Sequence, residues 1–124
     1  MNKINRKIFF EFLNLMKELS TKPVMKFAYQ SKFNWMVTCL IAQQDGEGIS
    51  FEEICAELAG DFCSRSTIQT ILDAGVAMKF YIKAPKKDDR RVQLYKITEG
   101  GEAHLEQWIT DHAEIFKAKV DDKY

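Results

Sequence analysis

The chain has 124 residues, of which 46% are hydrophobic and 29% charged, and its 18 basic side chains balance 18 acidic ones. This profile favours one globular domain and excludes a disordered chain. No apolar run approaches the roughly 18 residues of a membrane span, and the first residues carry charge throughout, unlike a signal peptide, so we expect a cytoplasmic protein without membrane contact.

Charge is unevenly distributed along the chain. Residues 64–91 hold seven basic and three acidic side chains, whereas acidic residues outnumber basic ones on both sides of this segment. A basic stripe in an otherwise acidic protein is typical of a surface that binds a polyanion.

The three cysteines indicate neither a disulfide framework nor a zinc site. Cys39, Cys55 and Cys63 lie far apart and include no C-x-x-C pair, so we expect them to pack as small apolar groups. Only Cys63 has a basic residue, Arg65, close enough in sequence to suggest a reactive thiol.

Two helices are predicted in the first third of the chain. Apolar residues recur at steps of three and four over residues 1–20, which indicates an amphipathic helix that ends before Pro23. A second helix is expected over residues 31–43; it is apolar almost all round and should therefore be buried. The stripe of the first helix consists of Ile4, Ile8, Phe9, Phe12, Leu15, Met16 and Leu19.

Two shorter helices are expected after the DGEG sequence at 45–48. Ser50 and Glu53 have the spacing of a capping box, and the helix that they open should end at Gly60. Ser64 is the cap candidate for the next helix, in which Ile68, Ile71 and Leu72 share one face. The opposite face is polar and comprises Arg65, Ser66, Gln69, Thr70 and Asp73.

A hairpin is predicted over residues 80–98, where the period changes from about 3.6 to 2. Pro85 and six consecutive charged residues, KKDDRR, separate two β-prone runs. The helical period then returns in a last helix over residues 102–120. The order of elements predicts a mainly α (α+β) fold, a winged helix-turn-helix, in a single domain over 1–124 with a lobe at 31–98 and its wing at 80–98.

Three short motifs resemble those of the multiple antibiotic resistance regulator (MarR) family of bacterial transcription factors. The resemblance is specific over about residues 49–110 and general in the flanking helices. The D-x-R of the family's wing is matched by Asp89 and Arg91, its L-T-x-x-G by Ile97, Thr98 and Gly101, and the S-x-S-T of its recognition helix by Ser64, Ser66 and Thr67.

The chain departs from the family pattern in three places. The connection AELAGDFC before the recognition helix is longer than usual, and the C-terminal end is short. Lys79 occupies the position where the family usually has a glycine between recognition helix and wing, while Gly75 falls inside the helix. Gly75 could instead be a C-cap that ends the helix at Ala74. We expect the longer helix, despite a cost of about 1 kcal/mol for the interior glycine, because the spacing from Thr67 to Asp89 then needs no gap.

The resemblance implies a homodimeric, sequence-specific transcription regulator that binds a pseudo-palindromic operator in double-stranded DNA. Of repressor and activator, we expect a repressor. The recognition helix would enter the major groove, where Arg65, Ser66, Gln69 and Thr70 suit the reading of base edges and the helix start at Ser64 and Thr67 favours phosphate. In the wing, Arg91 would enter the minor groove and Asp89 would order it. Lys86, Lys87 and Arg90 are assigned to phosphates.

The resemblance also implies that the helices over 1–20 and 102–120 intertwine as dimerisation helices. Family members often release DNA when a small aromatic acid binds between these helices and the DNA-binding lobe. Phe27, Tyr29, Phe33 and Trp35 could line such an effector pocket, although aromatics at helical spacing are more often core. The residues expected in the dimer interface are Ile4, Ile8, Phe12, Leu19, Trp108, Ile109 and Phe116.

The alternative is a winged helix that docks another protein without binding DNA, which the acidic ends and the zero net charge favour. An enzyme is not expected, because no catalytic constellation or glycine-rich phosphate loop appears. No cofactor is expected either. His104 and His112 lie eight residues apart, which is poor spacing for a metal site.

Overall fold

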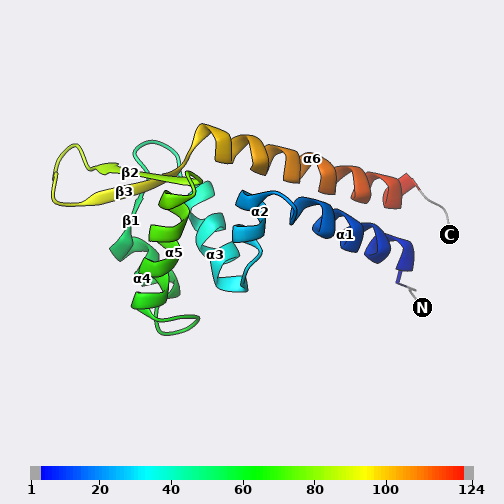
Figure 1. Ribbon diagram of the computed structural model, residues 1–124, viewed down its shortest axis with the longest axis horizontal. Helices are drawn as coiled ribbons and strands as arrows, with labels where there is room; N and C mark the ends of the chain where they lie inside the picture. The colour runs from blue at the N-terminus through cyan, green and yellow to red at the C-terminus, as the bar shows by residue number, and fades with distance from the viewer. Residues whose placement is uncertain (1–3, 122–124) are drawn as a thin grey trace.

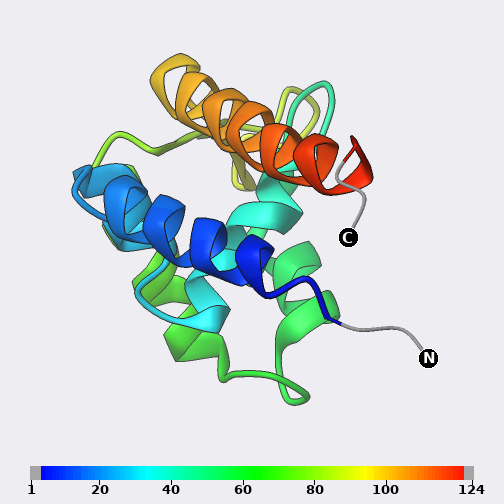
Figure 2. The same cartoon turned by 90° about the vertical axis from the view of Figure 1, so that its right-hand side faces the viewer.

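The computed structural model describes residues 4–121 and the side chains up to residue 117. Two long helices, α1 and α6, run side by side away from a lobe that contains the other helices and the sheet (Figure 1). The view turned by 90° shows the same pairing of α1 with α6 (Figure 2). The helices are α1 (Arg6–Leu19), α2 (Pro23–Ala28), α3 (Lys32–Ala42), α4 (Phe51–Leu58), α5 (Arg65–Ala77) and α6 (Glu99–Asp121); the strands are β1 (Ile49–Ser50), β2 (Tyr81–Pro85) and β3 (Gln93–Ile97).

Local sequence explains where the helices of the lobe begin. The predicted capping box is confirmed: Glu53 N donates to Ser50 Oγ, and Ser50 N donates to Glu53 Oε1, both over 3.1 Å. Ser64 caps α5, because its Oγ accepts a hydrogen bond from Thr67 N over 3.1 Å. Each cap satisfies backbone donors that lack a partner inside the helix.

The predicted hairpin is confirmed, and a third strand joins it. The sheet is antiparallel in the order β1, β3, β2, with Tyr81 opposite Ile97 and Ile49 opposite Tyr95. The hairpin projects from the lobe as the wing (Figure 1). The mainly α winged helix-turn-helix that the sequence predicts is therefore the fold of the chain.

The core lies where α3, α5 and the root of the wing meet. Tyr81 and Phe80 are fully buried and pack with Phe27 of α2 in edge-to-face contacts. The Tyr81 hydroxyl lies 2.6 Å from Thr38 Oγ1, and Thr38 in turn donates to the Asn34 carbonyl over 2.8 Å. Because the Thr38 proton is engaged with Asn34, Tyr81 is the donor between the two hydroxyls.

Two elements were absent from the sequence prediction. Helix α2 has six residues, beginning at Pro23, too few to show a helical period. Strand β1 has two residues and exists only because β3 pairs with it. No helix within residues 4–121 combines the length and the apolarity that a membrane crossing requires.

The longer recognition helix is confirmed, since α5 continues to Ala77 and Gly75 is a buried interior residue. The chain then leaves the helix through Lys79, whose φ of 63° lies in the left-handed region. Lys79, at the position where the resembled family usually has a glycine, thus adopts a left-handed conformation that glycine enters without strain. Thr98 Oγ1 donates to the Lys79 carbonyl over 2.7 Å and holds this turn against the start of α6.

The start of α6 explains the I-T-x-x-G motif. Thr98 Oγ1 accepts a hydrogen bond from Gly101 N over 3.0 Å and caps the helix. A Cβ at Gly101 would lie 2.6 Å from Phe80 Cδ1, so only glycine lets α6 approach the core this closely. The helix begins at Glu99, earlier than the expected residue 102, because both glycines belong to its first turn.

Candidate nucleic-acid interface

The polar face of α5 is exposed, and the side chains at its start bind one another. Ser64 Oγ donates to Thr67 Oγ1 over 2.9 Å and lies 3.1 Å from Ser66 Oγ. Ser64 and Thr67 therefore act mainly as the cap, whereas Ser66 is exposed on the outer surface. Helix N-termini of this kind present backbone N–H groups to phosphate.

Gln69 and Thr70 follow on the same face. Gln69 Nε2 donates to Asp73 Oδ1 over 2.9 Å, and Thr70 Oγ1 donates to the Ser66 carbonyl over 2.9 Å. Asp73 thus holds the Gln69 amide in a fixed orientation. A bidentate contact with adenine would require one amide hydrogen and the amide oxygen of Gln69, and Asp73 occupies only one of the two amide hydrogens.

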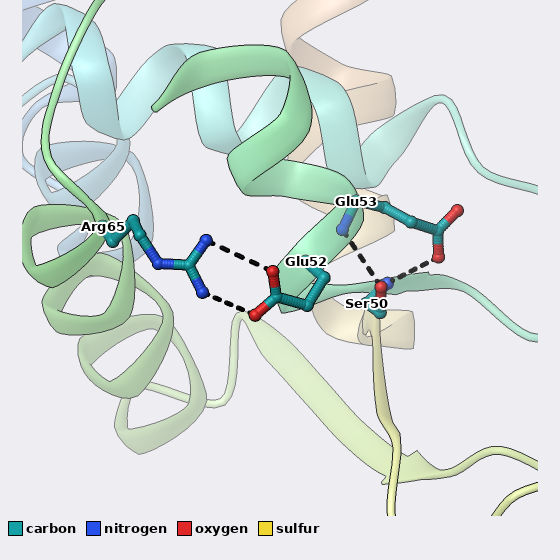
Figure 3. A network of polar contacts seen from close by, with 4 residues as sticks. All are labelled: Ser50, Glu52, Glu53 and Arg65. Atoms are coloured by element: carbon teal, nitrogen blue, oxygen red, sulfur yellow. Dashed lines mark hydrogen bonds and ion pairs between the residues drawn. The ribbon is translucent and has the colours of Figure 1, made fainter. Parts of the chain in front are cut away.

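Arg65 is bound by a residue that sequence reasoning missed, Glu52 of α4. Arg65 Nη1 donates to Glu52 Oε2 over 3.2 Å and Nη2 donates to Oε1 over 2.5 Å (Figure 3). The Arg65 hydrogen bonds hold the pKa of the Glu52 carboxyl below its usual value, and the same contacts raise the pKa of Arg65. The guanidinium carbon also lies 4.9 Å from the centre of the Phe51 ring. The two partners are thirteen residues apart, so no local pattern indicated the pair.

The wing holds Arg91 against Asp89. Arg91 Nε donates to Asp89 Oδ1 over 3.1 Å, Nη2 donates to Oδ2 over 3.2 Å, and the Arg91 backbone N donates to Oδ1 over 3.2 Å. These hydrogen bonds lower the pKa of Asp89. The Arg91 side chain is 91% exposed, so the aspartate orders an arginine that still faces solvent.

The other basic residues of the wing are less constrained. Lys87 and Arg90 are exposed and Lys86 is half-buried, and none of the three forms an ion pair with a described residue. The backbone around them is fixed, because Lys86 N donates to the Val92 carbonyl over 2.8 Å and Lys87 N donates to Glu47 Oε1 over 3.2 Å. Charges on a loop with a hydrogen-bonded backbone suit contacts to phosphate.

The fold brings α5, the predicted recognition helix, and the wing to one groove. This groove, of about 560 Å³, is lined by Phe51 and Glu52 of α4, Gln69 of α5, and Lys86 and Arg91 of the wing. Arg65 does not itself line the groove, but it is bound to Glu52, which does. Of the residues predicted to contact DNA, Gln69, Lys86 and Arg91 line this groove.

Apart from Trp108, which packs against Trp35 within the chain, the residues predicted for a dimer interface divide into two groups. Ile8 and Leu19 are buried within the chain, and Phe12 packs against His112 and Phe116 of α6, with ring centres 5.9 and 5.3 Å apart. The exposed group contains Ile4, Ile109 and Phe116, together with four further α1 residues: Phe9, Phe10, Leu13 and Met16.

The aromatic residues considered for an effector pocket pack mostly against other aromatics. Phe27 lies in the core, and Phe33 is packed against it from outside. Trp108 of α6 donates from Nε1 to the Tyr29 hydroxyl over 2.6 Å, and its ring centre lies 5.1 Å from that of Trp35. This cluster joins α6 to the lobe, and its close packing favours a structural role.

The cysteines do not have the environment of reactive thiols. Desolvation raises the pKa of the Cys63 thiol and that of Cys55, which is buried. It also raises the pKa of Cys39, which is exposed and not packed as expected. The Arg65 charge acts on Cys55, where desolvation outweighs it. A thiol with a raised pKa is a poor nucleophile near neutral pH, so this environment disfavours a redox role for Cys63.

No protein-family model and no curated protein sequence matches the chain. Solved structures do match it. A DNA complex of S. aureus MepR has a TM-score of 0.65 and 14% identity and covers 91% of this chain and 88% of that one. The transcriptional repressor CouR, bound to a 23-mer DNA duplex, has a TM-score of 0.57 and 20% identity and covers 94% and 72%.

A third match is a Bacillus cereus protein described as a MarR-like transcription regulator, with a TM-score of 0.53 and 16% identity over 98% of this chain and 86% of that one. Sequence identity this low establishes likeness of fold and leaves function to be argued from the site. The chain has the winged-helix fold of MarR-like transcription regulators.

Proposed function

We propose that the protein is a homodimeric transcription regulator of the MarR type that binds specific double-stranded DNA and acts as a repressor. The main support for this proposal is the Asp89–Arg91 pair, which presents an ordered and almost fully exposed arginine at the wing. An ordered arginine is the group that a narrow minor groove attracts. Gln69 of α5 lines the same groove as Arg91, and the polar face of α5 would enter the major groove.

Two of the solved structures that share the fold are DNA complexes, and one of these is named a repressor, which supports the proposal. A dimer is supported by the exposed apolar face of α1 and α6. Six large apolar side chains on these helices, and Ile4 just before α1, are at least half exposed, and a patch of this kind marks an interaction site. Two copies would place two recognition helices on two half-sites of an operator.

Salt titration of binding to duplex DNA tests the proposal against the alternative, a module that docks proteins only. The expected result is a complex at low salt whose affinity falls steeply as the salt concentration rises, because Lys and Arg side chains release counterions from phosphates. Absence of a DNA complex even at low salt would favour the protein-docking module. Footprinting of genomic fragments bound by the purified protein would then locate the operator.

A further inference from the structure

The two arginines of the interface are held by carboxylates through different edges of the guanidinium. Asp89 binds Arg91 through Nε and Nη2, the side edge. Glu52 binds Arg65 through Nη1 and Nη2, the end edge (Figure 3). Arg91 therefore keeps Nη1, at the tip of its side chain, free of the carboxylate, whereas the tip of Arg65 faces Glu52.

This difference decides what each arginine offers to DNA. Bidentate recognition of guanine, or of a phosphate, uses two neighbouring N–H groups on one edge. The end edge of Arg65 is occupied by Glu52, and one face of its guanidinium lies over the Phe51 ring. Arg65 is thus held on two sides by α4 and must leave Glu52 before it can contact DNA with its tip.

Two features of the Arg65–Glu52 pair distinguish it from a purely structural ion pair: water can compete for it, and its carboxylate lies in the groove. The Arg65 and Glu52 side chains are 55% and 72% exposed, so water competes for both, and such pairs break easily. Glu52 also lines the groove that contains Gln69, Lys86 and Arg91. DNA in this groove would bring phosphates toward the carboxylate, which they repel.

We propose that Glu52 masks Arg65 and thereby limits the affinity of the recognition helix for DNA. In the free protein the carboxylate occupies the end edge of the guanidinium; in the complex a base or a phosphate replaces it. The energy of the Arg65–Glu52 pair is then lost on binding, so removing Glu52 increases affinity. This inference rests on the proposed DNA-binding function.

The test compares Glu52→Gln with Glu57→Gln. Both changes remove one negative charge from α4 and keep the size of the side chain, but Glu57 is exposed and does not line the groove. The probe is a labelled duplex of about 30 base pairs, long enough for two half-sites one helical turn apart, recovered by the wild-type protein from a randomised pool. Dissociation constants are measured by fluorescence anisotropy, and thermal unfolding shows that each variant is folded.

We expect Glu52→Gln to bind the recovered duplex about two- to fivefold more tightly than Glu57→Gln does, a gain in the range of an exposed ion pair. The same measurement in an Arg65→Ala background separates unmasking from general charge. There the gain from Glu52→Gln should shrink, because no arginine remains to be released.

Three results would overturn the inference. Equal gains with and without Arg65 would show that Glu52 acts only by its charge. A loss of affinity in Glu52→Gln would show that the carboxylate positions Arg65 for side-edge contact. Equal affinity of Glu52→Gln and Glu57→Gln would show that the pair has no effect on binding. A wild-type protein that recovers no duplex from the pool would instead refute DNA binding itself, and with it the inference.

Discussion

The ring of Tyr81 fills the space that a Cβ at Gly75 would need, because an added Cβ would overlap Tyr81 Cδ2. Tyr81 is 1% exposed, and its hydroxyl is tied to Thr38, so the ring has no room to move aside. Glycine inside α5 lowers helix propensity by about 1 kcal/mol relative to alanine. In return, α5 and β2 pack in direct contact at the root of the wing.

Replacing Gly75 by alanine should therefore destabilise the protein by about 1–3 kcal/mol, although alanine is the better helix former, because the core becomes overpacked. Urea unfolding measures the change. Gly100→Ala is the matched control, since a Cβ at Gly100 meets nothing within 4 Å and should leave stability unchanged or slightly higher. A Gly75→Ala variant as stable as the wild type would show that Tyr81 can shift.

Lys79→Gly should stabilise the protein by up to about 1 kcal/mol, because it relieves the left-handed backbone of a residue with a Cβ. Lys79→Ala removes the same charge and side chain but keeps the Cβ, so it should give no such gain. Thermal unfolding of the two variants distinguishes backbone strain from charge. Equal stability of both variants would mean that the Thr98 contact to the Lys79 carbonyl already compensates the strain.

Stability should fall at alkaline pH, in part through Tyr81. Burial raises the pKa of Tyr81 well above its usual value, while in the unfolded chain this tyrosine ionises near pH 10. The free energy of unfolding that the protonated Tyr81 hydroxyl contributes is fully present below about pH 10. It is lost as the pH rises further toward the pKa of Tyr81 in the folded protein, at up to about 1.4 kcal/mol per pH unit. Urea unfolding between pH 8 and about 11 measures the slope.

Tyr81→Phe is the control for this titration. It should lower stability at pH 8 by about 1 kcal/mol through loss of the hydrogen bond to Thr38, and it should make the fall above about pH 10 shallower. Burial also raises the pKa of Tyr29 and of the three thiols, so part of the slope remains in the variant. An unchanged slope in Tyr81→Phe would assign the alkaline loss to those groups instead.

Phe10→Glu should dissociate the proposed dimer without unfolding the chain. Phe10 is 66% exposed on α1, so a charge there meets water in the monomer and an apolar partner in the dimer. Light scattering at micromolar concentration should show a dimer for the wild type and the 14.4 kDa monomer for the variant. DNA affinity should fall with it, because two half-sites then bind independently.

Phe12→Glu serves as the comparison, since Phe12 contacts His112 and Phe116 within the chain. It should reduce the unfolding temperature as well as dimerisation. A wild-type protein that scatters as a monomer would contradict the dimer.

Arg91→Ala should weaken binding to a specific site by about 1–3 kcal/mol and relax the preference for A·T pairs at the outer positions of each half-site. Lys86→Ala or Lys87→Ala should weaken binding about equally on all sequences and lower the salt slope by about one. Anisotropy on duplexes that differ only at the outer positions, over a range of salt concentrations, separates the two effects.

For Asp89→Ala, the direction of the change in DNA affinity distinguishes two roles of the wing. The substitution removes a negative charge, yet it should weaken DNA binding because Arg91 loses three hydrogen bonds that fix its position. A gain in affinity would mean that the wing acts only as a positive tip. The opposite sign expected for Glu52→Gln follows from the different edge of the arginine that each carboxylate binds.

The sequence by itself determined the features that depend on near neighbours. The capping box of Ser50 and Glu53 joins residues three positions apart, and the Asp89–Arg91 pair joins residues two apart, so short-range geometry decides both. The change of period predicted the hairpin, since alternation requires only that one face of a strand is covered. The length of α5 followed from the spacing of motifs in the resembled family.

Tertiary packing decided the rest. Glu52 and Arg65 meet because α4 and α5 pack together, and nothing in the residues around either one indicates the other. The stripe of α1 showed that one face is covered but not by what: α6 and the lobe bury Ile8 and Leu19, and Phe10 is left outside. An amphipathic pattern shows that burial of one helix face in place of exposure to water is favourable. The free energy gained by this burial is the same whether the covering surface belongs to the same chain or to a second copy.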